Sequence, residues 1–102
     1  MPEIMSILGY KIYFWVNEGI PLEPIHIHVS KNYNPNATKI WITSKGEFII
    51  EKNADKIPKQ DLRKIKRILK VIKKDIIKSW QSKFGEISYI DIVKSKQNPK
   101  GR

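Results

Sequence analysis

Residues 58–85 read PKQDLRKIKRILKVIKKDIIKSWQSKFG, and no other part of the chain indicates its architecture so strongly. Apolar residues recur there every three or four positions, which is the period of one face of an α-helix. Pro58 suits the first turn of a helix, and Gly85 is typical of a helix end. The stretch predicts one long amphipathic helix with an apolar face of Leu62, Ile65, Ile68, Leu69, Ile72, Ile76, Trp80 and Phe84.

The opposite face of this predicted helix carries a row of cations. Residues 58–84 hold ten Lys or Arg against two Asp, which is +8 of the net charge of +10. Like charges spaced i,i+4 cost about 0.2–0.5 kcal/mol per pair, so the row favours a polyanion or an acidic protein as a ligand. A solvated face is the simpler interpretation. The predicted binding residues are Arg63, Arg67, Lys70, Lys74 and Lys78.

Before residue 58 the hydrophobic period is near two, which is typical of half-buried strands. Gly9 indicates a turn between strands at 4–8 and 11–16, and residues 44–46 indicate a second turn between strands at 38–43 and 47–51. Residues 25–29 form a short strand between the two hairpins. The predicted fold class is α+β: an antiparallel sheet of about five strands packed on one long C-terminal amphipathic helix.

Length and composition set the remaining expectations. A chain of 102 residues has room for one domain, here predicted at 1–91, followed by a basic tail at 92–102. The absence of cysteine excludes disulfides and thiolate metal sites. Neither a signal peptide nor an apolar run of about 20 residues is present, so we expect a soluble cytoplasmic protein that does not enter a membrane. We expect no cofactor.

The segment His26-Ile27-His28 lies within the predicted strand at 25–29. Alternation along a strand places both imidazoles on the face opposite Ile27, projecting away from the hydrophobic interior. Such a pair can act as an acid–base couple or contact phosphate. With Glu23 it could also bind a metal ion, although no third histidine is present to close a zinc site. The simplest interpretation is two half-exposed histidines with structural hydrogen bonds.

One series of residues resembles a known bacterial family, the domain-of-unknown-function family 4160. The series is Asn17-Glu18-Gly19, Glu23-Pro24 and His26-Ile27-His28-Val29, followed by Lys39 and Trp41. The resemblance covers about residues 2–85. It implies a short bacterial protein of a toxin–antitoxin module, whose cognate small protein is encoded by an adjacent gene. It also implies a site at Asn17, Glu18, Pro24, His26 and His28, with Lys39 close by.

Three functions are compatible with these residues. The first is an RNA-binding module that cleaves RNA with His26 and His28 as acid and base, Lys39 stabilising phosphate charge and Glu18 orienting a ring. The second is a non-catalytic protein that docks an acidic partner protein through its cations or its sheet edges. The third is a metal-dependent hydrolase that uses both histidines with Glu18 or Glu23. Whether the protein is an enzyme stays open.

Overall fold

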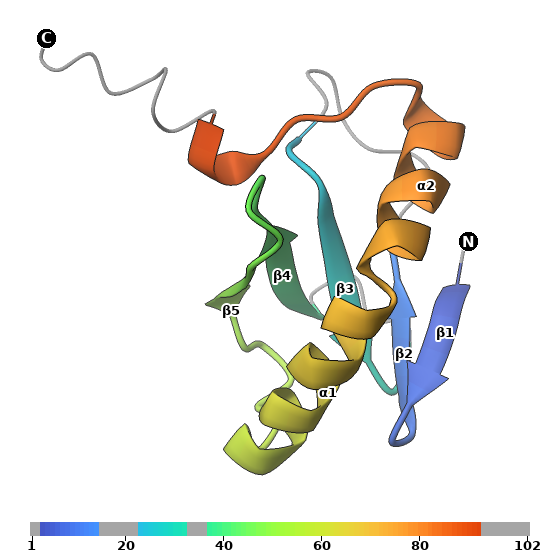
Figure 1. Cartoon of the computed structure of the whole chain (residues 1–102). Helices are drawn as coiled ribbons and strands as arrows, with labels where there is room; N and C mark the ends of the chain where they lie inside the picture. Colours follow the sequence, from blue (N-terminus) through green and yellow to red (C-terminus); the bar gives the residue numbers. More distant parts are fainter. Residues whose placement is uncertain (1–2, 15–22, 33–36, 93–102) are drawn as a thin grey trace, which may run out of the picture.

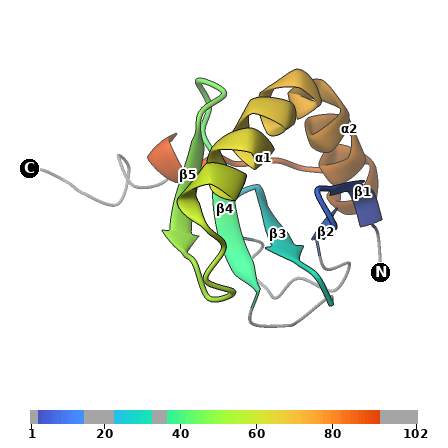
Figure 2. The same cartoon turned by 90° about the horizontal axis from the view of Figure 1, so that it is seen from below.

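The computed structural model of this chain describes residues 3–14, 23–32 and 37–92. One antiparallel sheet has the strand order β1-β2-β3-β4-β5, and two helices lie on one face of it (Figures 1 and 2). The predicted α+β class with five antiparallel strands is confirmed. The elements are β1 (Glu3–Ile7), β2 (Tyr10–Tyr13), β3 (His26–Ser30), β4 (Thr38–Ile42), β5 (Phe48–Lys52), α1 (Lys59–Val71) and α2 (Lys73–Phe84).

Both predicted hairpins have tight turns with left-handed residues. Leu8 and Gly9 have φ angles of 54° and 83°, so the two-residue turn between β1 and β2 has positive φ at both centres. Such turns match the twist of an antiparallel pair, although a branched residue such as Leu8 is unusual there. In the second hairpin, Gly46 takes φ 83°, and Thr43 N donates to Glu47 O at 2.9 Å. Glycine therefore occupies a position with positive φ in each turn.

The core lies between the sheet and the helices. Strand register aligns Ile12 with Val29 and Ile27 with Ile40, so that apolar side chains of β2, β3 and β4 share the face beneath α1 and α2. Five helix side chains close this face: Leu62, Ile65, Leu69, Ile76 and Trp80. All five belong to the predicted apolar face of the helix.

The prediction of one long helix is only partly right, because the chain bends at Ile72. Ile72 has φ −98° and ψ 12°, outside the helical range, and it separates α1 from α2. Ile72 N still donates to Ile68 O at 3.1 Å, and Ile76 N donates to Ile72 O at 3.1 Å. The apolar period runs unbroken through the bend, so the pattern contains no sign of it. Neither described helix is long and apolar enough to cross a membrane.

A straight helix over residues 59–84 would be about 39 Å long, whereas a strand of five residues spans only about 17 Å. The bend at Ile72 keeps the apolar faces of both helices on the short, twisted sheet, with α1 crossing near β5 and α2 near β2 (Figure 1). Gly85, at φ 75°, then ends α2 as predicted, and its N–H donates to Gln81 O at 2.8 Å.

Asn53 fixes the connection between β5 and α1. Its Oδ1 accepts from Thr38 Oγ1 at 2.8 Å and from Ile57 N at 3.0 Å, and its Nδ2 donates to Ile57 O at 2.9 Å. These bonds tie the loop to β4 and hold the start of α1 beside the end of β5. The relative position of α1 and β5 is therefore set by side-chain bonds as well as by the core.

Candidate functional site

The structure brings His26 and His28 together on β3. Their ring centroids lie 5.1 Å apart in an edge-on arrangement, and His28 also stacks on Tyr13 with centroids 5.7 Å apart. Both histidines are buried, with exposed fractions of 1% for His26 and 8% for His28. The expectation of half-exposed rings that project from the interior is therefore wrong.

Two indole rings contact the buried ring of His26. The last β2–β3 pair is Tyr13 with His28, so the described part of β2 does not flank β3 at His26. The indole of Trp80 from α2 reaches the ring there, at a centroid distance of 5.3 Å. Trp41, the β4 residue opposite His26, contributes a second indole at 5.4 Å. His26 is held between two indoles, which strand alternation alone does not predict.

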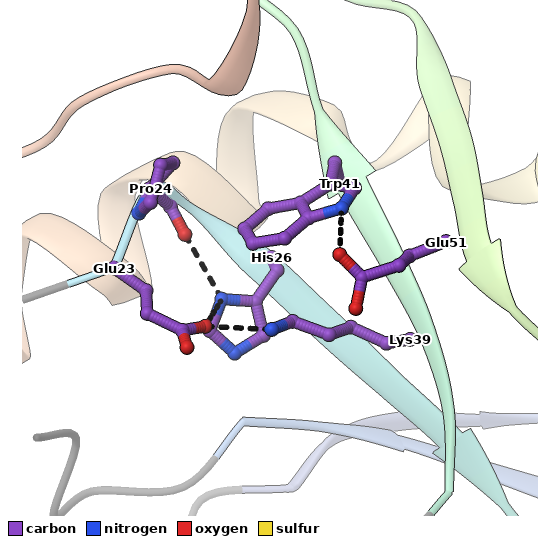
Figure 3. A network of polar contacts seen from close by, with 6 residues as sticks. All are labelled: Glu23, Pro24, His26, Lys39, Trp41 and Glu51. Carbon is purple, nitrogen blue, oxygen red and sulfur yellow. Dashed lines mark hydrogen bonds and ion pairs between the residues drawn. The ribbon is translucent and has the colours of Figure 1, made fainter. Parts of the chain in front are cut away.

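A polar network fixes the orientation of the His26 ring (Figure 3). His26 Nδ1 lies 2.9 Å from the carbonyl oxygen of Pro24 and 3.8 Å from Glu23 Oε1. A carbonyl oxygen only accepts hydrogen bonds, so Nδ1 carries the proton and the neutral ring keeps its lone pair on Nε2. His26 can therefore act as a base or a ligand only through Nε2.

Lys39 lies beside the histidines, as the resemblance implies, but its charge is already paired. It is opposite His28 in the β3–β4 register, and its Nζ donates to Glu23 Oε1 at 2.6 Å. The same Nζ lies 4.2 Å from the ring centroid of Trp41, whose Nε1 donates to Glu51 Oε1 at 2.8 Å (Figure 3). Lys39 would have to share or leave Glu23 before it could stabilise a phosphate.

Two further predictions concern the residues Glu18 and Asn17 and a metal site at the histidines. Glu18 and Asn17 lie outside the described residues. Across residues 3–14, 23–32 and 37–92, no three His, Cys, Asp or Glu side chains lie close enough together to hold a metal ion. His26, His28 and Glu23 therefore do not form a three-ligand metal site with one another.

The burial of Tyr13, which stacks on His28, predicts that the stability of the domain depends on pH. Burial raises the pKa of its phenol from the usual 10.0 to about 12, against the opposing effect of a hydrogen bond with Ser30. Between these values the unfolded chain loses the proton while the folded chain keeps it, so the free energy of unfolding is unaffected below pH 10 and falls as the pH rises toward 12.

Urea unfolding at a series of alkaline pH values measures this loss of stability. Tyr13→Phe removes the ionising group, so the variant should show a smaller decrease over the same range. If the wild type and Tyr13→Phe lose stability equally, the phenol of Tyr13 is not the cause. Tyr10→Phe should also reduce the alkaline loss of stability, since burial and Asp61 raise the pKa of Tyr10 as well.

A second candidate site is the groove between β5 and α1, called here the β5–α1 groove. Phe48 and Ile49 form its apolar side. A smaller adjoining pocket shares Arg63 and Lys66 with the groove and continues it along α1 past Ile50, Leu62 and Lys59. The remaining wall is cationic, and of the described lining residues only Glu47 is acidic: the full cationic set is Arg63, Lys66, Arg67 and Lys70.

The predicted row of five cations is divided by the bend at Ile72. Arg63, Arg67 and Lys70 line the groove, while Lys74 and Lys78 belong to α2; all five are exposed. Lys66 also lines the groove but was not among the predicted binding residues, because it lies at the border of the predicted apolar face of the helix and not opposite that face. Its spacing of four residues from both Leu62 and Lys70 is the signal that could have identified it.

Comparison with known proteins identifies one family. A family model described as a domain of unknown function, DUF4160, matches residues 9–81. Searches of curated proteins and of solved structures gave no match. The matched range runs from the β1–β2 turn into α2 and contains both the histidine pair and the groove cations.

Proposed function

We propose that this chain, which belongs to the DUF4160 family of domains of unknown function, is an interaction module that binds an acidic segment of a partner protein in the β5–α1 groove. The observation that carries the proposal is the composition of the groove. Four cationic side chains face an apolar strand edge, and one carboxylate lies among the described lining residues.

Charge complementarity supports an acidic ligand. Arg63 and Arg67 are four residues apart on α1, as are Lys66 and Lys70, so each pair of cations repels by about 0.2–0.5 kcal/mol. Carboxylates in the groove would remove this repulsion. Guanidinium groups also bind carboxylates through two parallel hydrogen bonds, which fixes the orientation of the bound segment.

The apolar side of the groove favours a protein over a nucleic acid. Ile49 lines the groove and is 46% exposed, so it offers aliphatic surface at the edge of the sheet, on the face away from α1. Phe48 is the aromatic residue of the described lining, but only 4% of it is exposed. Sites for single-stranded nucleic acids use exposed aromatic rings on which bases stack. An amphipathic protein segment uses both the cations and the aliphatic surface.

RNA is the second candidate ligand, because the exposed Lys74 and Lys78 continue the cationic surface along α2. Histidine-based cleavage of RNA would require the scissile phosphate to reach Nε2 of His26, a residue that is 1% exposed. Burial therefore favours binding without cleavage. A cognate protein from an adjacent gene, as in a toxin–antitoxin module, is the first partner to test.

The test compares two double charge reversals with the same change in net charge. Arg63→Glu/Arg67→Glu alters the groove, whereas Lys64→Glu/Lys83→Glu alters exposed cations that do not line it. We expect the first variant to bind the adjacent gene product at least about tenfold more weakly, a loss of about 1.4 kcal/mol, and the control to change affinity by less than about twofold.

Two outcomes would contradict the proposal. Equal losses in both variants would mean that binding depends on net charge and not on the groove. Binding of RNA but not of the adjacent gene product, with affinity that falls steeply with salt and with losses in a Lys74→Glu/Lys78→Glu variant, would identify RNA as the ligand.

A further inference from the structure

Strand β5 is an edge of the sheet formed by the described residues, and its outer side borders the β5–α1 groove. Thr43 follows β4, Glu47 precedes β5, and Thr43 N donates to Glu47 O. These two residues are therefore the first hydrogen-bonded pair between the two strands. Bonded pairs alternate in an antiparallel ladder, so the next one is Trp41 with Ile49. The backbone N–H and C=O groups of Phe48 and Ile50 therefore point outward, away from β4.

The side chains of β5 divide between the two faces of the sheet. Phe48 and Ile50 pack on the core beneath the helices, whereas Ile49 lies on the opposite face and is exposed. Residues that face one another across a strand pair point to the same side of the sheet. A strand added outside β5 would thus place alternate side chains below α1, next to Arg63 and Lys66, and the others beside Ile49.

We infer that the acidic partner segment binds as an additional β-strand on the outer edge of β5. This inference rests on the proposed function and adds a conformation and a sequence pattern. Side chains on the helix-covered face should be Asp or Glu, and those on the other face should be β-branched apolar residues that pack on Ile49. A helix bound in the groove would leave the outward backbone groups of Phe48 and Ile50 unpaired by the ligand.

The sequence of β5 supports this mode of binding. Exposed edge strands are usually protected by charged residues or proline, which prevent pairing with other chains. The centre of β5, Phe48-Ile49-Ile50, carries neither, and its charged residues, Glu51 and Lys52, lie at the C-terminal end. The apolar centre of this edge strand, beside a cationic wall, fits pairing with an acidic strand.

Hydrogen exchange of the full chain tests the inference. The probe is a synthetic peptide of alternating Glu and Val, and the control peptide has the same composition with Glu in helical i,i+4 spacing. With the alternating peptide, we expect the amides of Phe48 and Ile50 to exchange at least about tenfold more slowly. The amides of β1, on the other edge of the sheet, should not change.

The outcomes separate this inference from the proposed function. If the alternating peptide binds and Arg63→Glu/Arg67→Glu abolishes binding, but Phe48 and Ile50 gain no protection, the strand arrangement is wrong and the groove remains the site. Tighter binding of the helical control peptide would also overturn the strand arrangement. If neither peptide nor the adjacent gene product binds, the proposed function itself fails.

Discussion

Replacement of Trp80 by alanine is expected to lower the free energy of unfolding by about 3–5 kcal/mol, the usual cost of removing a buried indole. Trp80 is fully buried, and its ring centroid lies 5.4 Å from that of Phe14 and 4.5 Å from that of Phe84. It also contacts His26, so its loss would remove the contacts of α2 with Phe14 and with β3. Urea unfolding followed by circular dichroism measures the change.

Trp80→Phe is the matched variant for this experiment. The indole N–H of Trp80 is buried and has no hydrogen-bond partner in the part of the chain that the structure describes. Phenylalanine therefore keeps most of the apolar contact without losing a bond, and it should destabilise the domain much less than alanine does. If both variants are as stable as Gln81→Ala, an exposed neighbour, then Trp80 does not join the helix to the sheet.

The fold was largely predictable because its local patterns agree with its tertiary structure. Gly9 and Gly46 occupy turn positions with positive φ, where glycine has no steric cost. The apolar positions of the helical stretch, from Leu62 to Trp80, are the ones that the core buries. The bend at Ile72 was not predictable, because it depends on the length and twist of the sheet and not on a Pro or Gly in the helix.

The candidate site was less predictable than the fold. Alternation correctly places His26 and His28 on one face, but it carries no information about what covers that face. The contact with Trp80 depends on how α2 packs on the sheet, which is a property of the assembled domain. The pairing of Lys39 with Glu23 joins residues 16 positions apart, and it follows from the neighbouring positions of β3 and β4.

The second large effect is expected for His26→Ala. The variant should lose about 2–4 kcal/mol of unfolding free energy, because it leaves a cavity between two indoles and removes the donor to the Pro24 carbonyl. His26→Asn should lose less, since the side-chain amide of asparagine can donate to the same carbonyl from nearly the position of Nδ1. Urea unfolding of both variants measures the difference.

The stabilities of His26→Ala and His26→Asn determine what an activity assay of each variant can show. Loss of activity in His26→Ala would not identify a catalytic group, because an unstable domain loses every activity. His26→Asn retains the bond to Pro24 but lacks the Nε2 lone pair, so it separates chemistry from folding. As an interaction module, the folded His26→Asn variant should bind the adjacent gene product as the wild type does. If instead the wild type cleaves RNA and folded His26→Asn does not, Nε2 acts in catalysis despite its burial, and the acid–base interpretation replaces the one proposed here.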